Sequence, residues 1–213
     1  THHRLDTRTI TFSTTHTVSA WFFPKWLHSI NCNLKQFEIR IKSEGMYSAM
    51  QALVDGDSDF LICFHYADTP DVIDPAKFSY KVLTTDFIVP VTAPDADGTA
   101  RWHLPGTADA PVDYLSFPKD VHLGSIIHHA LAQQAQPCHL RIGYENPMAE
   151  SLKTMAVEGH GVSWLPLCSV MTSLKLKELV RIEDTRWDIP VEIRLYKFSE
   201  DRRQKVNDLW ALI

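Results

Sequence analysis

The sequence lacks any long hydrophobic run. No stretch of about 18 apolar residues occurs, and no charged-then-apolar leader precedes the first expected strand. We therefore expect no membrane span, no secretory signal and no membrane partner. Cysteine is also scarce, and the four cysteines lie far apart, at Cys32, Cys63, Cys138 and Cys168. Without C-x-x-C pairs, and in so long a chain, they indicate reduced thiols in a cytoplasmic protein rather than a zinc ribbon or a disulfide scaffold.

Positive charge is in the minority. The 26 Asp and Glu residues outnumber the 21 Lys and Arg residues, which gives a formal net charge of −5. Surfaces that bind nucleic acid are strongly basic. We therefore do not expect this segment itself to bind DNA.

The sequence motifs of common enzyme classes are missing. There is no G-x-x-x-x-G-K-[ST] and no G-x-G-x-x-G after the first strand. "GVSWL" begins like the nucleophile elbow G-x-S-x-G, but Leu165 stands where the sharp turn needs its last glycine. The carboxylates look scattered over the surface, for example Glu44, Asp55, Asp57 and Asp59. We expect neither an enzyme nor a cofactor.

Histidines are numerous, but their spacing does not suit a metal. His128 and His129 are adjacent, and His122 lies seven residues before His129. Metal ligands on one helix usually stand four residues apart, as in H-E-x-x-H. Cys138 and His139 add soft ligands that are near in sequence only. We expect no metal site.

The chain does contain alternating strands and helices. The segments "TITFSTT" and "FEIRIKSE" have the residue pattern of strands. The apolar spacing predicts a helix over residues 18–29, with an apolar face formed by Trp21, Phe22, Trp26 and Leu27, and a second helix over residues 45–55. "GDSDFLICF" then gives a turn and a nearly all-apolar strand. Continuous apolar strands separated by helices indicate a parallel sheet covered on both faces.

A long strand over residues 82–92 and the Pro/Gly/Asp-rich residues 92–111 interrupt this rhythm, and the alternation then restarts. Further strands are expected at "VDYLSF", "CHLRIGYE", "GVSWLP", "LVRI" and "PVEIRLYKF", with helices over residues 122–135, 148–159, 167–174 and 200–213. The expected fold is α/β with two Rossmann-like lobes. The first lobe takes residues 8–90 and 194–213, the second takes residues 91–193, and two crossover strands join them. In such folds, ligands bind outside the carboxyl ends of the strands, so we expect one cleft shared by the lobes.

The stretch "ITFSTTHTVSAW" places hydroxyl groups and an imidazole where the first strand meets the first helix. Thr14, Thr15, His16, Thr17 and Ser19 lie there. Free amides, the helix dipole and hydroxyl donors collect anions at such a place. One of these hydroxyls could simply cap the helix, but four around one histidine exceed what a cap needs.

These segments resemble the effector-binding domain of LysR-type transcriptional regulators over the whole chain. The resemblance is carried by "ITFSTTHTVSAWFFPKWLHSI", "IRIKSEGMYSAMQALVDGDSDFLICF", "FIVPVTAPD" and "AVEGHGVSWLP", the last of which matches a G-x-G-[VI]-x-x-[LI]-P segment. It implies a periplasmic-binding-protein type II-like fold and side-by-side homodimers, with tetramers for the full-length protein. It also implies a DNA-binding winged helix-turn-helix upstream of Thr1, which is absent from this chain and through which alone DNA would be bound.

A narrower resemblance is to the hypochlorite-responsive branch of that family. "FLICFHYADTP", "SFPKDVHLGSIIH" and "NPMAESLKTMAVEGHGVSWLP" carry it. In that branch a methionine at the start of the second-lobe helix is linked to oxidant sensing, and Met148 stands at the matching position. Sulfoxide formation would turn this flexible apolar side chain polar.

The resemblance and the strand ends together suggest the residues that contact the effector. They are Thr15, Thr17 and His65 in the first lobe and Ser116, His122, Asn146 and Met148 in the second. Three of them also have a plainer interpretation. His65 could be a surface residue, and Met148 could fill a gap at a lobe interface. Asn146 could be an N-cap, with Pro147 at the first helical position and Glu150 near the capping-box position.

The expected function is that of a ligand-sensing regulatory domain. A small, anionic effector, or an oxidant acting on Met148, would change the closure of the lobes and so modulate DNA binding and transcription. The alternative is a periplasmic-type solute-binding protein of a transporter, which shares the two-lobe architecture. A constitutive dimerisation module with a vestigial cleft is a third possibility. The sequence upstream of Thr1 would discriminate between the first two.

Overall fold

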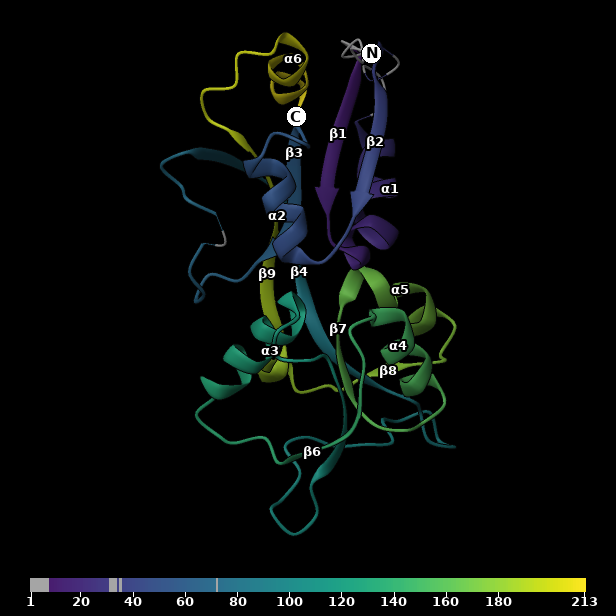
Figure 1. Cartoon of the computed structure of the whole chain (residues 1–213). Helices are drawn as coiled ribbons and strands as arrows, with labels where there is room; N and C mark the ends of the chain where they lie inside the picture. Colours follow the sequence, from purple (N-terminus) through teal and green to yellow (C-terminus); the bar gives the residue numbers. More distant parts are fainter. Residues whose placement is uncertain (1–7, 31–33, 35, 72) are drawn as a thin grey trace. The chain divides into compact units, whose positions relative to one another are not determined.

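The computed structural model describes residues 8–30, 34, 36–71 and 73–213. The chain divides into two compact units (Figure 1). Unit 1 comprises Thr1–His65, Pro70–Thr84 and Ile193–Ile213, and unit 2 comprises Tyr66–Thr69 and Thr85–Glu192. The strands β4 (Phe78–Thr92) and β9 (Ile189–Phe198) belong partly to one unit and partly to the other. None of the described helices is long and apolar enough to cross a membrane.

Unit 1 alternates strands and helices as the sequence predicts. Its elements are β1 (Thr9–Thr14), the π-helical turn η1 (Val18–Phe22), α1 (Phe23–Ser29), β2 (Glu38–Ser43), α2 (Met46–Val54), β3 (Phe60–His65), the first part of β4, the last part of β9, and α6 (Gln204–Leu212). The strands follow the order β2-β1-β3-β9-β4. Strand β1 pairs in parallel with both β2 and β3, and every residue of β3 is buried. Parallel pairing and a fully buried central strand confirm the α/β fold.

An aromatic cluster fills the side of the sheet covered by η1 and α1. Phe12 of β1 lies with its ring centroid 5.2 Å from Phe23, 5.9 Å from Trp26 and 5.3 Å from Phe60. Such aromatic pairs contribute beyond the apolar area that they bury. The cluster fixes the helix that leaves the end of β1.

The first helix buries Trp26, as the sequence predicts, but the other residue that it buries is Phe23, which was not expected. Phe23 is buried, whereas Trp21 and Phe22 are only half-buried. The N–H of Phe23 donates to the carbonyl of Val18, five residues before it, so the chain makes one wide turn that shifts the helical phase. Pro24 follows at once and has no N–H of its own to continue the ordinary ladder.

Unit 2 contains a second set of strands and helices. Its elements are β5 (Val112–Ser116), α3 (His122–Ala132), β6 (Leu140–Glu145), α4 (Ala149–Val157), β7 (Ser163–Pro166), α5 (Leu167–Lys175), β8 (Val180–Arg181) and the short 3-10 helix η3 (Thr185–Trp187). Strands β5 and β6 pair in parallel, while β4 pairs antiparallel with β7 and β8. The predicted restart of the alternation is therefore confirmed.

Trp164 forms the centre of the unit 2 core. It is fully buried, its indole Nε1 donates to the carbonyl of Trp187 at 2.9 Å, and the Tyr114 ring meets it edge-on at 5.5 Å. The hydrogen bond satisfies the polar atom of a large buried ring. These contacts connect β7, η3 and β5 in one packed layer.

Asp59, which the sequence places among surface carboxylates, is buried. Its side chain is 4% exposed and accepts hydrogen bonds from the backbone N–H of Thr11 at 2.8 Å and from Arg203 at 2.6 Å. The ammonium of Lys205 lies 3.3 Å away and also donates to the carbonyl of Thr9 at 2.6 Å. Through these contacts, Asp59 connects Arg203 and Lys205, at the start of α6, with β1.

Candidate functional site

The predicted site residues fall into two groups, and each group lies at strand ends within one unit. Thr15, Thr17 and His65 follow or end β1 and β3 in unit 1. Ser116, His122, Asn146 and Met148 follow or end β5 and β6 in unit 2. The carboxyl ends of parallel strands meet at one edge of a sheet, where α/β proteins bind ligands.

Part of the hydroxyl run in unit 1 is structural. Thr14 is fully buried and donates to the carbonyl of Ile62 at 2.7 Å. Ser13 is also fully buried and donates to the carbonyl of Ala49 at 2.7 Å. The expectation that Thr14 takes part in an accessible hydroxyl cluster is therefore wrong, because its hydroxyl joins β1 to β3.

Thr15 and Thr17 differ in their accessibility. Thr15 is half-buried just after β1, and its carbonyl accepts from the N–H of Ser19 at 3.0 Å. Thr17 is only 9% exposed. His16 lies between them, exposed, with Nδ1 3.1 Å from the hydroxyl of Ser43 at the end of β2. Ser43 is a residue that sequence reasoning missed; the parallel register that pairs Thr14 with Ser43 is the signal that would have found it.

His65 is a buried end of β3 rather than a surface loop residue. Its Nδ1 lies 3.6 Å from the carboxylate of Asp71. Asp71 also accepts from the guanidinium of Arg194 at 3.2 Å, and that guanidinium lies 4.1 Å from the centroid of the Tyr80 ring. An imidazole and a guanidinium thus share one carboxylate. Sequence reasoning missed Asp71 and Arg194, which are 123 residues apart.

Cys63 lies next to this cluster without reactive character. Burial raises the pKa of its thiol to about 12, and the nearby charge of Arg194 offsets only part of that effect. A thiol with so high a pKa remains protonated at neutral pH and is a poor nucleophile. Cys63, Cys138 and Cys168 are free in the part of the chain that the structure describes, and Cys32 lies outside that part.

Hydrogen bonds bring three residues of the unit 2 group together. The N–H of Asn146 donates to the carbonyl of Ser116 at 3.0 Å, and the side-chain oxygen of Asn146 accepts from the N–H of Met148 at 2.9 Å. The amide nitrogen of Asn146 donates to the hydroxyl of Tyr144 at 2.9 Å. The hydroxyl of Ser116 itself donates to the carbonyl of Phe117 at 2.7 Å. The entry to α4 is therefore fixed on the end of β5.

The capping reading of Asn146 needs a correction. Helix α4 begins at Ala149, so Met148 occupies the N-cap position and Pro147 precedes the helix. Asn146 bonds the N–H two residues on, which is an Asx-type turn and not an N-cap. Met148 is 39% exposed.

His122 is the first residue of α3 and is half-buried. Two residues later, a Cβ on Gly124 would lie 2.0 Å from the carbonyl oxygen of Pro118. Only a glycine allows the first turn of α3 to approach the preceding loop so closely. This contact fixes the loop that carries Lys119 and leads to His122.

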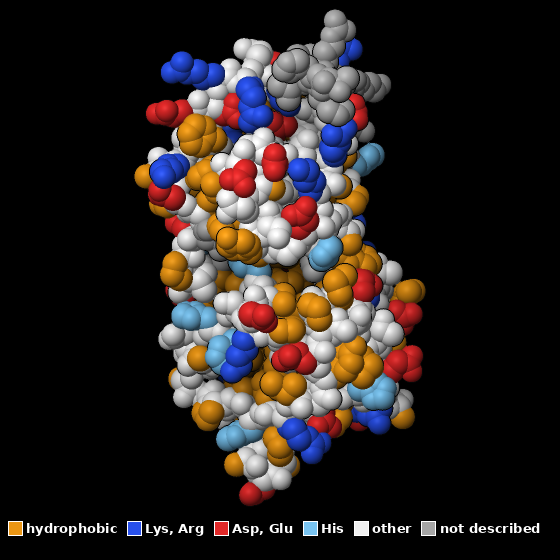
Figure 2. Space-filling model, viewed as in Figure 1, with side chains coloured by type: hydrophobic (Ala, Val, Ile, Leu, Met, Phe, Trp, Pro, Cys, Tyr) orange, Lys and Arg blue, Asp and Glu red, His pale blue; other side chains and the backbone are white. Residues whose placement is uncertain are grey.

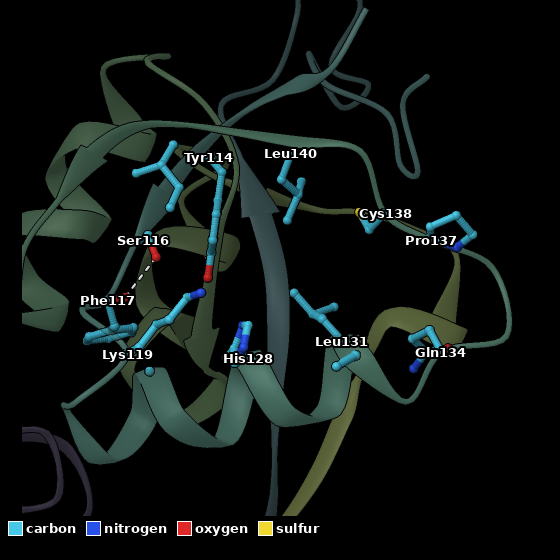
Figure 3. Close-up of a pocket in the computed structure, with 13 residues that line it drawn as sticks. Tyr114, Ser116, Phe117, Lys119, His128, Leu131, Gln134, Pro137, Cys138 and Leu140 are labelled. Carbon is cyan, nitrogen blue, oxygen red and sulfur yellow. Dashed lines mark hydrogen bonds between the residues drawn. The ribbon is translucent and has the colours of Figure 1, made fainter. Parts of the chain in front are cut away.

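A cavity of about 420 Å³ lies within unit 2 (Figure 3). Ser116 is the predicted site residue that lines it. The other lining residues are Tyr114, Phe117, Lys119, Gly124, His128, Leu131, Ala132, Gln134, Pro137, Cys138, Leu140 and Ile142. Sequence reasoning considered His128 as a metal ligand and Cys138 as a reduced thiol or a metal ligand, and missed Tyr114 and Lys119.

Two further observations concern the distribution of surface charge and the grouping of side chains that could bind a metal ion. On the face shown in Figure 2, Lys and Arg side chains are interspersed with Asp and Glu side chains, without one continuous basic area. Among the described residues, no three His, Cys, Asp or Glu side chains are grouped so that they could hold a metal ion.

The chain matches the family of LysR substrate binding domains over residues 3–213. Among curated proteins it is 23% identical over 203 residues to the HTH-type transcriptional regulator YjiE of Escherichia coli (strain K12), covering 95% of this chain and 63% of YjiE. It is 22% identical over 203 residues to the HTH domain-truncated transcriptional regulator QseD of Escherichia coli O157:H7, covering 95% of this chain and 79% of QseD. The chain thus spans less than two thirds of the length of YjiE.

The fold is similar to that of the regulatory domain of HypT from Salmonella typhimurium, a hypochlorite-specific LysR-type regulator. The apo form superposes with a TM-score of 0.82 at 21% identity, covering 99% of this chain and 94% of that domain. A bromide-bound form superposes with a TM-score of 0.81, also at 21% identity, covering 99% and 96%. The matched family is one of regulatory domains and not a class of enzymes, and it decides between a regulator and a transporter component. The chain belongs to the LysR substrate-binding domain family, the effector-binding domains of LysR-type transcriptional regulators.

Proposed function

We propose that this domain senses a small anionic effector through the polar side chains at its strand ends. The observation that carries the proposal is the group formed by Thr15, His16 and Ser43, where hydroxyls and an imidazole remain at least partly accessible at the adjacent ends of β1 and β2. Such donors suit an anion at a strand-to-helix turn. The bromide held by the HypT regulatory domain supports an anion as the class of ligand.

The unit 2 group offers, within that unit, a second place for an anion in this proposal. His122 and Asn146 supply an imidazole and an amide, and Ser116 a hydroxyl, at the ends of β5 and β6. An effector acts only if it interacts unequally with the arrangements that the domain can adopt. In the full-length protein, that difference would modulate DNA binding by a separate N-terminal domain in a homodimer or tetramer, in the cytoplasm.

We expect Thr15→Ala to weaken sulfate binding by about tenfold or more, because a hydrogen bond to a charged group contributes about 1.5–3 kcal/mol. The melting temperature should stay nearly unchanged, since the Thr15 side chain is half-buried at a strand end rather than in the core. Isothermal titration calorimetry measures the affinity. Thr172→Ala, at an exposed position of α5, is the matched control. Equal affinity of the Thr15 variant and the wild type would remove Thr15 from the site.

Met148 is the proposed oxidant-sensing residue, and the chain offers a control for it. Met148 is 39% exposed and Met171 is 37% exposed, so exposure alone predicts equal oxidation by hypochlorite. We expect sulfoxide to form at Met148 several-fold faster than at Met171, because a sensing site binds and positions its oxidant. Peptide mass spectrometry at limiting hypochlorite measures both rates. Equal rates, or faster oxidation of Met171, would contradict a sensing role.

A further inference from the structure

The cavity in unit 2 has the size of a small-molecule site. Its volume of about 420 Å³ lies within the range of about 300–1,000 Å³ that is usual for ligand pockets. Side chains of β5, of α3, of the loop between them and of the segment from Gln134 to Ile142 line it (Figure 3), and it is open to solvent, where Lys119, His128 and Ile142 are exposed. The cavity lies wholly within unit 2, so its shape depends on the packing of that unit alone.

Lys119 and Tyr114 place two polar groups at one end of the cavity, whereas His128 lies near its middle and Gln134 at its other end (Figure 3). The Lys119 ammonium and the Tyr114 hydroxyl point toward one another at the start of α3 (Figure 3). Among the lining residues that the structure describes, Lys119 is the one with a permanent charge, and none is a carboxylate. Burial raises the pKa of Tyr114 to about 12, although a hydrogen bond with Ser116 lowers it in part. The phenol therefore stays protonated at neutral pH and can donate a hydrogen bond beside the ammonium.

The rest of the cavity is mostly apolar. Leu131 from α3 faces Leu140 and the segment of Pro137 and Cys138 on the opposite wall (Figure 3). Ile142, also in the lining, is 54% exposed on β6, none of whose residues is fully buried. Covering such surface removes apolar area from water and so favours binding of an apolar group.

We propose that this cavity binds an organic monoanion with an apolar chain. Its acid group lies between the Lys119 ammonium and the Tyr114 hydroxyl, and its chain extends along α3 between Leu131 and Leu140. The absence of a carboxylate from the described lining suits one negative charge, and the apolar lining side chains favour an anion that carries an apolar chain. The inference does not rest on the proposed effector site, with which it shares Ser116 alone.

The test compares octanoate with octanol, which has the same chain length and no charge. We expect calorimetry to detect octanoate binding at millimolar concentrations or below, and at least about tenfold weaker binding of octanol, since a charge-assisted hydrogen bond is lost. Lys119→Met should weaken octanoate about tenfold, and Tyr114→Phe, which keeps the ring against Trp164, should weaken it several-fold. Lys175→Met, exposed at the end of α5, should change nothing. Failure of octanoate to bind, or equal binding by octanol, overturns the proposal.

Cys138 provides a second measurement at the cavity wall. Burial raises the pKa of its thiol to about 11, so it is alkylated slowly and only at alkaline pH. Bound octanoate should slow alkylation of Cys138 by iodoacetamide several-fold and leave Cys168 unaffected. Ala132→Phe, which fills the cavity from an exposed position of α3, should abolish both binding and protection. Octanoate binding that survives Ala132→Phe and Lys119→Met together overturns the proposal. Octanoate binding should be unchanged in Thr15→Ala, so the two sites can fail separately.

Discussion

Replacement of Asp59 by Ala is expected to lower the free energy of unfolding by about 3 kcal/mol. The carboxylate is almost fully buried and accepts from Arg203 and from the N–H of Thr11. Its loss leaves the N–H without its side-chain acceptor and Lys205 without this anion, whereas Arg203 keeps its pairing with Asp201. Removing one partner of a buried ion pair costs about 3–5 kcal/mol, and the partial exposure of Arg203 at 45% places the expected value at the lower end.

Urea unfolding followed by circular dichroism measures this loss. Asp57→Ala is the matched control, because Asp57 is an exposed carboxylate two residues away in the same turn, and it should change stability by less than about 0.5 kcal/mol. Asp59→Asn keeps an acceptor for Thr11 and should give an intermediate loss. Equal effects of the Asp57 and Asp59 variants would show that the buried network does not stabilise unit 1.

Trp164→Ala is expected to cost about 4 kcal/mol of unfolding free energy, because truncation of a fully buried aromatic ring typically costs about 3–5 kcal/mol. The ring contacts Tyr114 edge-on, and its N–H satisfies the carbonyl of Trp187. The variant removes both contacts and leaves a cavity in unit 2. Thermal and urea unfolding of the domain measure the change.

Trp164→Phe is the control for that prediction. It keeps most of the apolar volume and loses the hydrogen bond to Trp187, so it should cost clearly less than the alanine variant. Leu176→Ala removes a large side chain that is 64% exposed and should have little effect. A Trp164→Ala variant as stable as Leu176→Ala would contradict the packing described for unit 2.

The order of elements was predictable from sequence because burial leaves a local pattern. Strand β3 is apolar at nearly every position, and a parallel central strand is buried on both faces. Strand β4 begins at Phe78, four residues before the predicted start; after the buried Phe78, its first part alternates half-buried and exposed side chains and so lacks the apolar run of its second part. The burial of Phe23 could not be predicted, since the wide turn that the hydrogen bond from Phe23 to Val18 closes leaves no mark in the apolar spacing.

The roles of individual polar residues were less predictable, because they depend on partners far away in the chain. Thr14 and Thr15 are adjacent and chemically identical, yet the hydroxyl of Thr14 is used inside the sheet. Asp59 looks like its neighbour Asp57 in sequence, but its partners Arg203 and Lys205 lie 144 and 146 residues later. The sequence therefore indicated which residues lie at strand ends better than it indicated which of their side chains are accessible.

The central claim is that polar groups at the strand ends bind an anionic effector. The most direct measurement is the anomalous scattering of a domain crystal soaked in selenate, a sulfate analogue with a strong anomalous signal. If these groups bind an anion, we expect a selenium peak within hydrogen-bonding distance of Thr15, or of His122 and Asn146. Peaks found solely beside exposed Lys and Arg side chains, away from the carboxyl ends of β1, β2, β5 and β6, would contradict it.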